Sequence, residues 1–202
     1  MRVAAIIIGS WLLVEFYGYC LHVLLHSDRL RWLSQRHMAH HLHLDGYPPG
    51  RRMRSNQYRH VSDNYFRIAG VGLEWLAPAI ILIAVTALGE WAIGLTWLEI
   101  LASEIILISY SIFLFGYLHD QMHVKNNWLL RSTFFRRWFL KARRNHDIHH
   151  NHITDQGLMG KNFGIAFPLY DHLFGTYHHR LEGLNKYGVE AAYDRYDISR
   201  KK

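Results

Sequence analysis

The stretch Trp97–His123 reads WLEILASEIILISYSIFLFGYLHDQMH and combines the two features on which the fold depends. Its first part, 97–118, is an apolar run of roughly the 20 residues that a bilayer-crossing helix needs. The motif His119-x-x-x-His123 follows directly. A spacing of four residues puts both imidazoles on one face of a helix. The stretch therefore predicts a membrane helix that ends in two side chains suited to binding a metal.

Three more motifs of this kind occur in the chain, and we call the four together the histidine boxes. Ten of the 16 histidines fall in them. In chain order the boxes are His22-x-x-x-His26, His37-x-x-His40-His41, His119-x-x-x-His123 and His146-x-x-His149-His150. A single histidine is most often solvated or hydrogen-bonded, but that explanation does not account for four boxes. Imidazole is a favoured ligand of iron, zinc, copper and nickel, and ten exceed the needs of one tetrahedral zinc. We therefore predict a site for two metal ions.

Two further apolar runs, 3–25 and 71 to about 88, are also long enough to cross a membrane. The mean hydropathy of −0.08 hides these runs, because His-rich polar stretches alternate with them. Each run has a flaw, since ionisable residues or a proline interrupt it. The interrupting residues are Glu15, Pro78, Glu99 and Glu104. The alternative is a set of buried helices in a soluble protein.

The distribution of Lys and Arg favours the membrane. Of 23 such residues, 22 lie in segments 27–70 and 119–202, and only Arg2 lies elsewhere. The positive-inside rule places both segments in the cytoplasm. Three crossings agree with this, with the N-terminus outside and every histidine box inside, so that all the boxes meet at one end of the bundle. The net charge of +7 then fits a cytoplasmic membrane face better than nucleic-acid binding.

We therefore expect an all-α integral membrane fold of one domain, 1–202, with about three transmembrane helices and a cytoplasmic histidine-rich helical cap that holds a dinuclear metal site. A bacterial inner membrane or the endoplasmic reticulum would suit this multi-pass topology. The N-terminal run is expected to stay in place rather than be cleaved as a signal peptide, because its end supplies two histidines. The single Cys20 excludes an internal disulfide and argues against a thiolate metal site.

Three other segments carry expectations of their own. Segment 45–64 holds Arg51, Arg52 and Arg54 and is predicted to be a loop, facing either anionic lipid headgroups or solvent. Segment 128–144 places aromatic residues on one face of a basic helix, which suits either the membrane interface or packing on the protein's own cap. The polar segment 181–202 is predicted to be a partly ordered tail.

Glu15 lies seven residues before His22 and therefore on the same helical face. An ionisable group inside a membrane helix is a candidate for a functional role. One hypothesis makes Glu15 the partner that fixes the tautomer of an imidazole ligand. The other places it against a water-filled cavity.

The boxes resemble those of the membrane-bound fatty acid hydroxylase superfamily, which includes sterol desaturases, fatty acid 2-hydroxylases and beta-carotene hydroxylases. The resemblance covers roughly residues 10–180. It includes Asn162-Phe163-Gly164 and the stretch PLYDHLFGTY at 168–177, which is similar to the NFG…PLWD-x-LFGT pattern common in the superfamily. The four-box order is closer to fatty acid 2-hydroxylases and carotenoid hydroxylases, although their first box tends to be HxxxxH. We do not expect the cytochrome b5 domain that often precedes fatty acid 2-hydroxylases, because these 202 residues leave no room for one.

This resemblance implies a di-iron, O2-dependent oxidoreductase that hydroxylates an apolar lipid such as a fatty acyl chain. Zinc could replace the two irons in a purified or crystallised form. The resemblance implies no catalytic residue beyond the metal ligands. Carried over box by box, those ligands are His22, His26, His37, His40, His41, His119, His123, His146, His149 and His150. His172, His178 and His179 lie near the LFGT motif and are candidates to support the ligands or to line an entrance.

Several alternatives remain open at this stage. Desaturation of a lipid or sterol and hydroxylation of a carotenoid ring could use the same site. Because no flavin, haem or dinucleotide motif is present, we expect a separate electron donor of the ferredoxin or cytochrome b5 type. Outside the enzymes, the chain could be a His-rich metal transporter or a metal-binding membrane protein. Transporters usually have internal repeats and place their ligands at the bilayer midplane, unlike the arrangement expected here.

Overall fold

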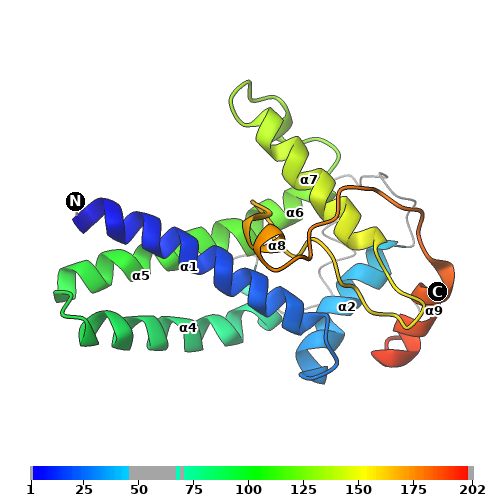
Figure 1. Ribbon diagram of the computed structural model, residues 1–202, viewed down its shortest axis with the longest axis horizontal. Helices are drawn as coiled ribbons and strands as arrows, with labels where there is room; N and C mark the ends of the chain where they lie inside the picture. Colours follow the sequence, from blue (N-terminus) through cyan, green and yellow to red (C-terminus); the bar gives the residue numbers. More distant parts are fainter. Residues whose placement is uncertain (1, 46–66, 69–70, 200–202) are drawn as a thin grey trace.

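The computed structural model describes residues 2–45, 67–68 and 71–199. These form a bundle of long helices with a cap of shorter elements at one end (Figure 1). The bundle contains α1 (Arg2–Leu25), α4 (Leu73–Ala92) and α5 (Trp97–Ser111), the last continued by the π-helix η1 (Ile112–Leu118) and by α6 (His119–His123). The cap contains α2 (Arg31–Asp45), the 3-10 turn η2 (Trp128–Leu130), α7 (Arg136–Asn151), α8 (Leu169–Leu173) and α9 (Lys186–Arg195).

A short antiparallel hairpin precedes α4. Its strands are β1 (Arg67–Ile68) and β2 (Val71–Gly72), with Arg67 opposite Gly72. The predicted loop with Arg51, Arg52 and Arg54 lies outside the described residues.

Three helices are long and apolar enough to cross a membrane, namely Arg2–Leu25, Glu74–Ala92 and Trp97–His123. Their apolar side chains mostly face outward, since only 28 %, 6 % and 28 % of their most apolar windows are buried. Contiguous exposed apolar surface of this kind marks contact with a membrane or a partner. The prediction of three spans is therefore confirmed, and the outward orientation disagrees with buried helices of a soluble protein.

The third span is longer than its apolar run. It begins at a capping box in which Thr96 and Glu99 bond reciprocally to each other's backbone N–H groups, so the charge of Glu99 lies at a helix start rather than in mid-span. The helix then continues without a break through η1 into α6 and ends at His123. The third histidine box is thus the last turn of a membrane-crossing helix.

The helices of the bundle approach closely at Gly18. A Cβ atom added there would lie 2.5 Å from Cζ of Phe115, so only glycine leaves room for that ring. The ring of Phe115 in turn stacks on Trp75 of α4, with centroids 4.4 Å apart and planes 12° from parallel. Small residues where helices meet are typical of membrane bundles. Stacked aromatic rings are typical of soluble protein cores.

Polar side chains inside the bundle bond to one another. Ser10 and Ser103 lie 2.9 Å apart across α1 and α5. Thr86 of α4 donates to Glu104 of α5 at 2.7 Å. Such pairs give hydrogen-bond partners to polar groups that would otherwise have none in hydrocarbon. They explain how the spans tolerate the polar residues that interrupt their apolar runs.

The C-terminal segment, predicted to be a partly ordered tail, instead contains α9, which packs on α2. Tyr196 is fully buried, and its hydroxyl donates to the carbonyl of His26 at 2.7 Å. Met38 and Leu42 of α2 share a buried cluster with Ala192 and Tyr196. The polar composition was misleading because only one face of this short helix is apolar. The C-terminal segment is therefore part of the cap.

α7 runs obliquely to the bundle, and its N-terminal end projects away from it (Figure 1). The structure confirms packing on the cap for part of this segment, and the membrane-interface alternative stays a prediction. Phe139 is completely buried, and Arg143 donates to the carbonyls of Gln121, Met122 and Val124 at the end of the third span. Phe134, by contrast, is 81 % exposed just before the helix. The second half of α7 belongs to the cap, and its start is an exposed aromatic and basic end.

Candidate metal centre

The four histidine boxes converge where the bundle meets the cap. The first box lies at the end of α1, with His26 just beyond the last helical residue. α2 carries the second box, α6 the third and α7 the fourth. The side chains of these boxes are buried or half-buried. The ends of α1 and α6 and the helices α2 and α7 therefore direct their imidazoles into one volume.

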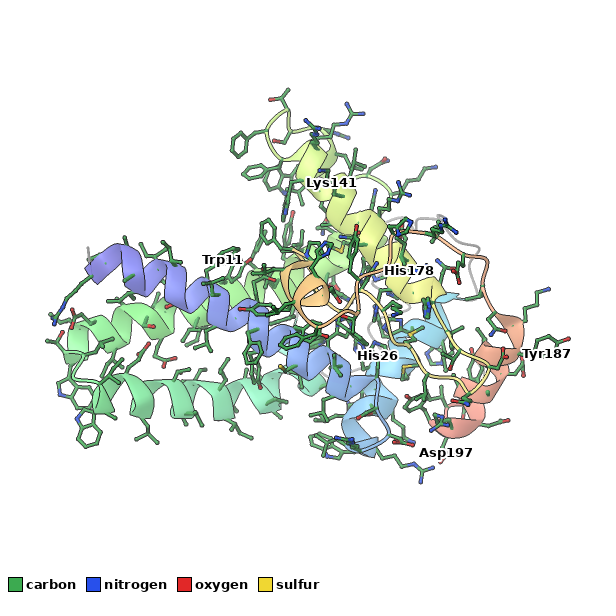
Figure 2. All side chains as sticks on the ribbon, in the orientation of Figure 1. Trp11, His26, Lys141, His178, Tyr187 and Asp197 are labelled. Carbon is green, nitrogen blue, oxygen red and sulfur yellow. The ribbon has the colours of Figure 1, made fainter. Side chains whose placement is uncertain are left out.

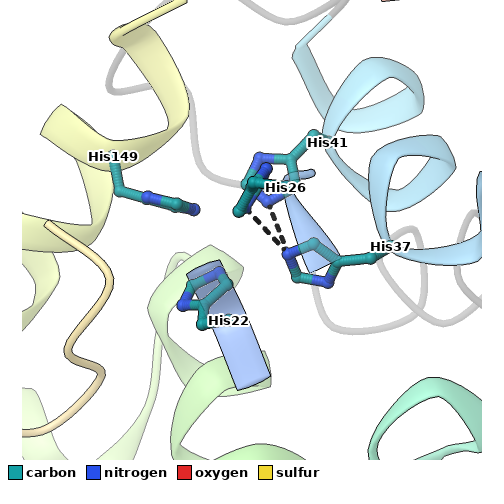
Figure 3. A group of neighbouring side chains, drawn as sticks. All are labelled: His22, His26, His37, His41 and His149. Atoms are coloured by element: carbon teal, nitrogen blue, oxygen red, sulfur yellow. Dashed lines mark hydrogen bonds between the residues drawn. The ribbon is translucent and has the colours of Figure 1, made fainter. Parts of the chain in front are cut away.

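One group of imidazoles contains five buried side chains whose candidate ligand atoms all lie within 4.8 Å of one another. Its members are His22, His26, His37, His41 and His149 (Figure 3). Nε2 of His37 lies 3.0 Å from Nε2 of His26 and 3.2 Å from Nε2 of His41. Two nitrogens bound to one ion at about 2.1 Å are separated by about 3.0–3.4 Å. The spacing is thus that of neighbouring ligands on a shared metal.

A second group, also within 4.8 Å, contains His40, His119, His123 and His150. His146 adjoins it, because its Nε2 lies 3.0 Å from Nε2 of His123 and 3.1 Å from Nε2 of His150. The rings of His41 and His150 connect the two groups, with centroids 4.0 Å apart. All ten predicted ligands therefore lie in one centre with two candidate ion positions.

Several of these nitrogens are buried without a hydrogen-bond partner among the described residues. They are Nε2 of His22, His40, His119 and His149 and Nδ1 of His41. Buried polar atoms are rarely left without a partner, because desolvation is then uncompensated. Bound metal ions would satisfy the Nε2 atoms of both groups at once. The residues present fit two metal ions with imidazole ligands.

Burial also keeps the imidazoles in the protonation state that ligation needs. It lowers the pKa of His37, His41 and His149 well below the usual value for histidine, and neighbouring imidazoles add to the effect. The same holds for His26, His40 and His146. These side chains are therefore neutral at physiological pH, with a lone pair free for a metal.

Two backbone carbonyls orient members of the first group. Nδ1 of His22 lies 2.6 Å from the carbonyl oxygen of Phe163, and Nδ1 of His149 lies 2.7 Å from that of Lys161. A carbonyl can only accept, so each Nδ1 carries the proton and each Nε2 is left with its lone pair toward the centre. Contacts of this kind fix the tautomer and ring orientation of metal-binding histidines.

The residue between these two carbonyls holds the backbone in an unusual conformation. Asn162 has φ of 54°, the left-handed region that asparagine tolerates better than most residues. Its side chain donates to the carbonyl of His178 at 2.8 Å and accepts from the N–H of His178 at 2.7 Å. Asn162 thereby turns the chain so that the carbonyls on both sides reach an imidazole.

Asp171, at the base of the same loop, fixes the next two residues. Its carboxylate accepts from the backbone N–H groups of Phe163 at 2.7 Å and Gly164 at 2.8 Å, and from the hydroxyl of Thr176 at 2.8 Å. A Cβ atom on Gly164 would lie 2.4 Å from the carbonyl oxygen of Phe167. The NFG, Asp and GT parts of the downstream motif thus form one support for the histidine centre. This supporting role was not predicted from the sequence, although the motif was visible there and was the signal that could have indicated it.

The hypothesis that Glu15 is the partner of an imidazole ligand is not supported. Glu15 accepts a hydrogen bond from the hydroxyl of Tyr110 at 2.5 Å, and that hydroxyl also accepts from Trp11 at 2.9 Å. Seven residues along a helix is about 10 Å, so sharing a face with His22 does not bring the carboxylate to its ring. The carbonyl of Phe163 takes the role predicted for Glu15.

The three histidines near the LFGT motif lie outside the centre. The ring of His172 is exposed and lies against Tyr177, with centroids 3.9 Å apart. The ring of His178 pairs with Glu182 at 3.2 Å. His179 is exposed and lines a separate cavity beside α7. Of the three, His178 supports the centre, through its backbone bonds to Asn162 rather than its ring.

Comparison with known protein families agrees with this arrangement. The model of the fatty acid hydroxylase family matches residues 7–176, most of the chain. The chain belongs to the fatty acid hydroxylase family. The region matched to that family contains every histidine box and ends at Thr176, so it includes the loop support and excludes α9. No curated protein and no solved structure matches the chain. The fatty acid hydroxylase assignment implies oxidoreductase activity, and the family is typically metal-dependent, which agrees with a histidine cluster that could hold metal ions.

Proposed function

We propose that this fatty acid hydroxylase family member is a membrane-bound, di-iron, O2-dependent monooxygenase that hydroxylates an apolar lipid. The observation that carries the proposal is the pair of adjoining buried imidazole groups at one end of a membrane-crossing bundle. Two irons held there would supply the reduction of O2 and the attack on an unactivated C–H bond. One oxygen atom enters the substrate, and the other becomes water with two electrons from a separate donor and two protons from solvent.

The division of the ligands follows from the two groups. His22, His26, His37, His41 and His149 would hold one iron. His40, His119, His123 and His150, with His146 beside them, would hold the other. Imidazole also binds zinc, which could occupy the same ligands in a purified form. Iron is proposed because zinc is not redox-active and could not carry the electrons.

An apolar cavity beside the first group supports a hydrocarbon substrate. It measures about 100 Å³ and lies between α1, α4, α5 and η1. Leu21, Leu107 and Ile112 are among its lining residues. Membrane lipid could reach it sideways, since it lies among helices whose outer faces are apolar. We propose that a short segment of an acyl chain or related lipid occupies it.

An aromatic layer of Trp75 and Phe115 lines this cavity on the side where Trp75 approaches the histidines. Trp75 and Phe115, which stack on each other, both line the cavity. The ring centroid of Trp75 lies 5.5 Å from that of His22 and 5.6 Å from that of His37. These two aromatic side chains would therefore position the carbon to be oxidised and keep water from the centre.

The electron donor would approach the cap from the cytoplasm. The basic segments that flank the spans support this orientation, because cytoplasmic segments of membrane proteins carry an excess of Lys and Arg. A ferredoxin or a cytochrome b5 type protein would suit as the donor, since such proteins deliver single electrons to separate oxygenases.

The proposal is tested by comparing lipids from cells that express the wild type with lipids from cells that express His149→Ala. A lipid heavier by one oxygen, absent from the variant and present with the matched control His172→Ala, supports hydroxylation and identifies the substrate. A lipid lighter by two hydrogens would replace hydroxylation with desaturation, and an oxidised carotenoid would identify a ring hydroxylase. Iron flux across proteoliposomes without an oxidised lipid would instead favour a transporter.

A further inference from the structure

A second and larger cavity lies along α7, beside the turns that precede the fourth histidine box. It measures about 540 Å³ and is formed by α7, the segment 166–168 and the segment 177–179. We call it the α7 pocket. His146, His149 and His150 follow on the next turns of the same helix. None of the box histidines lines the α7 pocket, so the pocket is distinct from the proposed oxidation site.

One wall of the α7 pocket is cationic. Lys141 and Arg144 are three residues apart on α7 and so share a face of the helix. Both are exposed, and the guanidinium of Arg144 donates to the carbonyl of His179 at 3.4 Å across the pocket edge. Asn145 adds a neutral donor. Among the described residues that line the pocket, none is acidic. The wall thus presents positive charge without an internal counter-ion.

The other wall is apolar and continuous with the bundle. Trp138 donates its indole N–H to the carbonyl of Ala166 at 3.2 Å, and its ring lies 5.9 Å from that of Phe167. Phe167 in turn packs edge-to-face on Trp11 of α1, with centroids 5.6 Å apart. Lys141 lies on α7 and Trp11 on α1 (Figure 2). The pocket therefore leads from positive charge to the side of a membrane-crossing helix.

The surroundings of the α7 pocket have the composition of a membrane interface. Phe134 and Leu140 are 81 % and 43 % exposed at the start of α7, beside exposed Arg136 and Arg137. Exposed aromatic and basic residues on one helix are typical of the interface between headgroups and acyl chains. An occupant must match this arrangement, with an anionic group at one end and hydrocarbon at the other.

We propose that the α7 pocket binds an anionic phospholipid, with its phosphate at Lys141 and Arg144 and its glycerol and upper acyl carbons along Trp138 and Phe167. Free phosphate shares the anionic chemistry but would leave the apolar wall uncovered. The bound lipid would hold α7, and with it the fourth histidine box, at a fixed depth in the membrane. The inference does not depend on the reaction at the metal centre.

The test is native mass spectrometry of the full chain in detergent, titrated with phosphatidylglycerol or phosphatidylcholine. The wild type is expected to retain one phosphatidylglycerol with an affinity roughly tenfold or more above that for phosphatidylcholine. The double variant Lys141→Gln/Arg144→Gln is expected to lose that preference. The matched variant Arg131→Gln/Arg137→Gln, which removes two exposed charges outside the pocket, should keep it. Elution of both variants as the wild type in size-exclusion chromatography shows that they are folded.

The source of the anion is decided by competition. Inorganic phosphate at millimolar concentration is expected to leave the bound phosphatidylglycerol in place. Its displacement by phosphate alone would overturn the lipid assignment and make the pocket a site for a soluble anion. Equal binding of both lipids by the wild type would overturn the assignment of the pocket as a lipid-binding site. Equal loss of preference in the two double variants would do the same, because it would show that lipid binds through general surface electrostatics.

Discussion

The carbonyl oxygen of Phe163 lies 2.6 Å from Nδ1 of His22, although 141 residues separate them in the chain. This contact gives the imidazole one tautomer and turns Nε2 toward the centre. It also makes the metal centre depend on a loop that contributes no ligand of its own. The loop is shaped by Asn162 and held by Asp171.

Asp171→Asn should weaken metal binding although it changes none of the metal-binding histidines. The neutral amide can accept at only one of the two oxygen positions, so the N–H of Phe163 or Gly164 loses its partner and the loop relaxes. Loss of such outer contacts typically lowers metal affinity by about 10–100-fold. Iron retained against a chelator would measure it. Asp194→Asn, at an exposed position on α9, is the control, and equal retention by both variants would contradict the role of Asp171.

Replacing one histidine in each group should separate the two ion positions. His26→Ala removes a member of the first group and His119→Ala a member of the second. Each variant should bind roughly half the iron of the wild type, since the other group keeps its imidazoles. Elemental analysis of the purified proteins measures this, with His172→Ala as the unaffected comparison. Full iron content in either group variant would refute the division of ligands.

Gly18→Ala should disturb the aromatic layer beside the centre and leave the metal bound. The new Cβ atom would lie 2.5 Å from Phe115, so the ring must move and take its stacking on Trp75 with it. Overpacking of this kind typically destabilises by about 1–3 kcal/mol. Turnover of the lipid should fall while iron content stays constant. Gly9→Ala on the same helix, where nothing lies within 4 Å, is the matched control and should behave as the wild type.

Tyr196→Phe should destabilise the cap by about 1–3 kcal/mol, because it leaves the buried carbonyl of His26 without its donor. Limited proteolysis in detergent should then cut the region of α9 sooner than in the wild type. Tyr187→Phe on the same helix changes an 82 % exposed side chain and should have no effect. Identical cleavage in the two variants would show that α9 is not anchored through Tyr196.

The helical spans and the convergence of the boxes were predictable from the sequence. Apolar length and the positions of Lys and Arg determine which segments can cross a membrane, and the boxes follow at the ends of those segments. The spacing in each box also requires its imidazoles to share a helical face. The adjacency of His41 and His150, which joins the two groups, then follows from the packing of α2 near α7.

Other features depend on contacts that residue spacing does not reveal. The partner of His22 is a backbone carbonyl far along the chain, and any residue type supplies a carbonyl, so no side chain signals it. Glu15 shares a face with His22, but a shared face does not specify distance along the helix axis. The packing of α9 had a signal that polar composition obscured, since Val189, Ala192 and Tyr196 recur at helical spacing.

The proposed function requires that the histidine centre transfer one oxygen atom from O2 to a membrane lipid. Mass spectrometry of lipids from cells that express the chain under oxygen-18-labelled O2 measures this transfer. We expect a lipid that carries one labelled oxygen atom and is absent when His149→Ala is expressed. A product whose new oxygen comes from water, or an iron-loaded and reduced protein that leaves every lipid unchanged, would refute the proposed transfer.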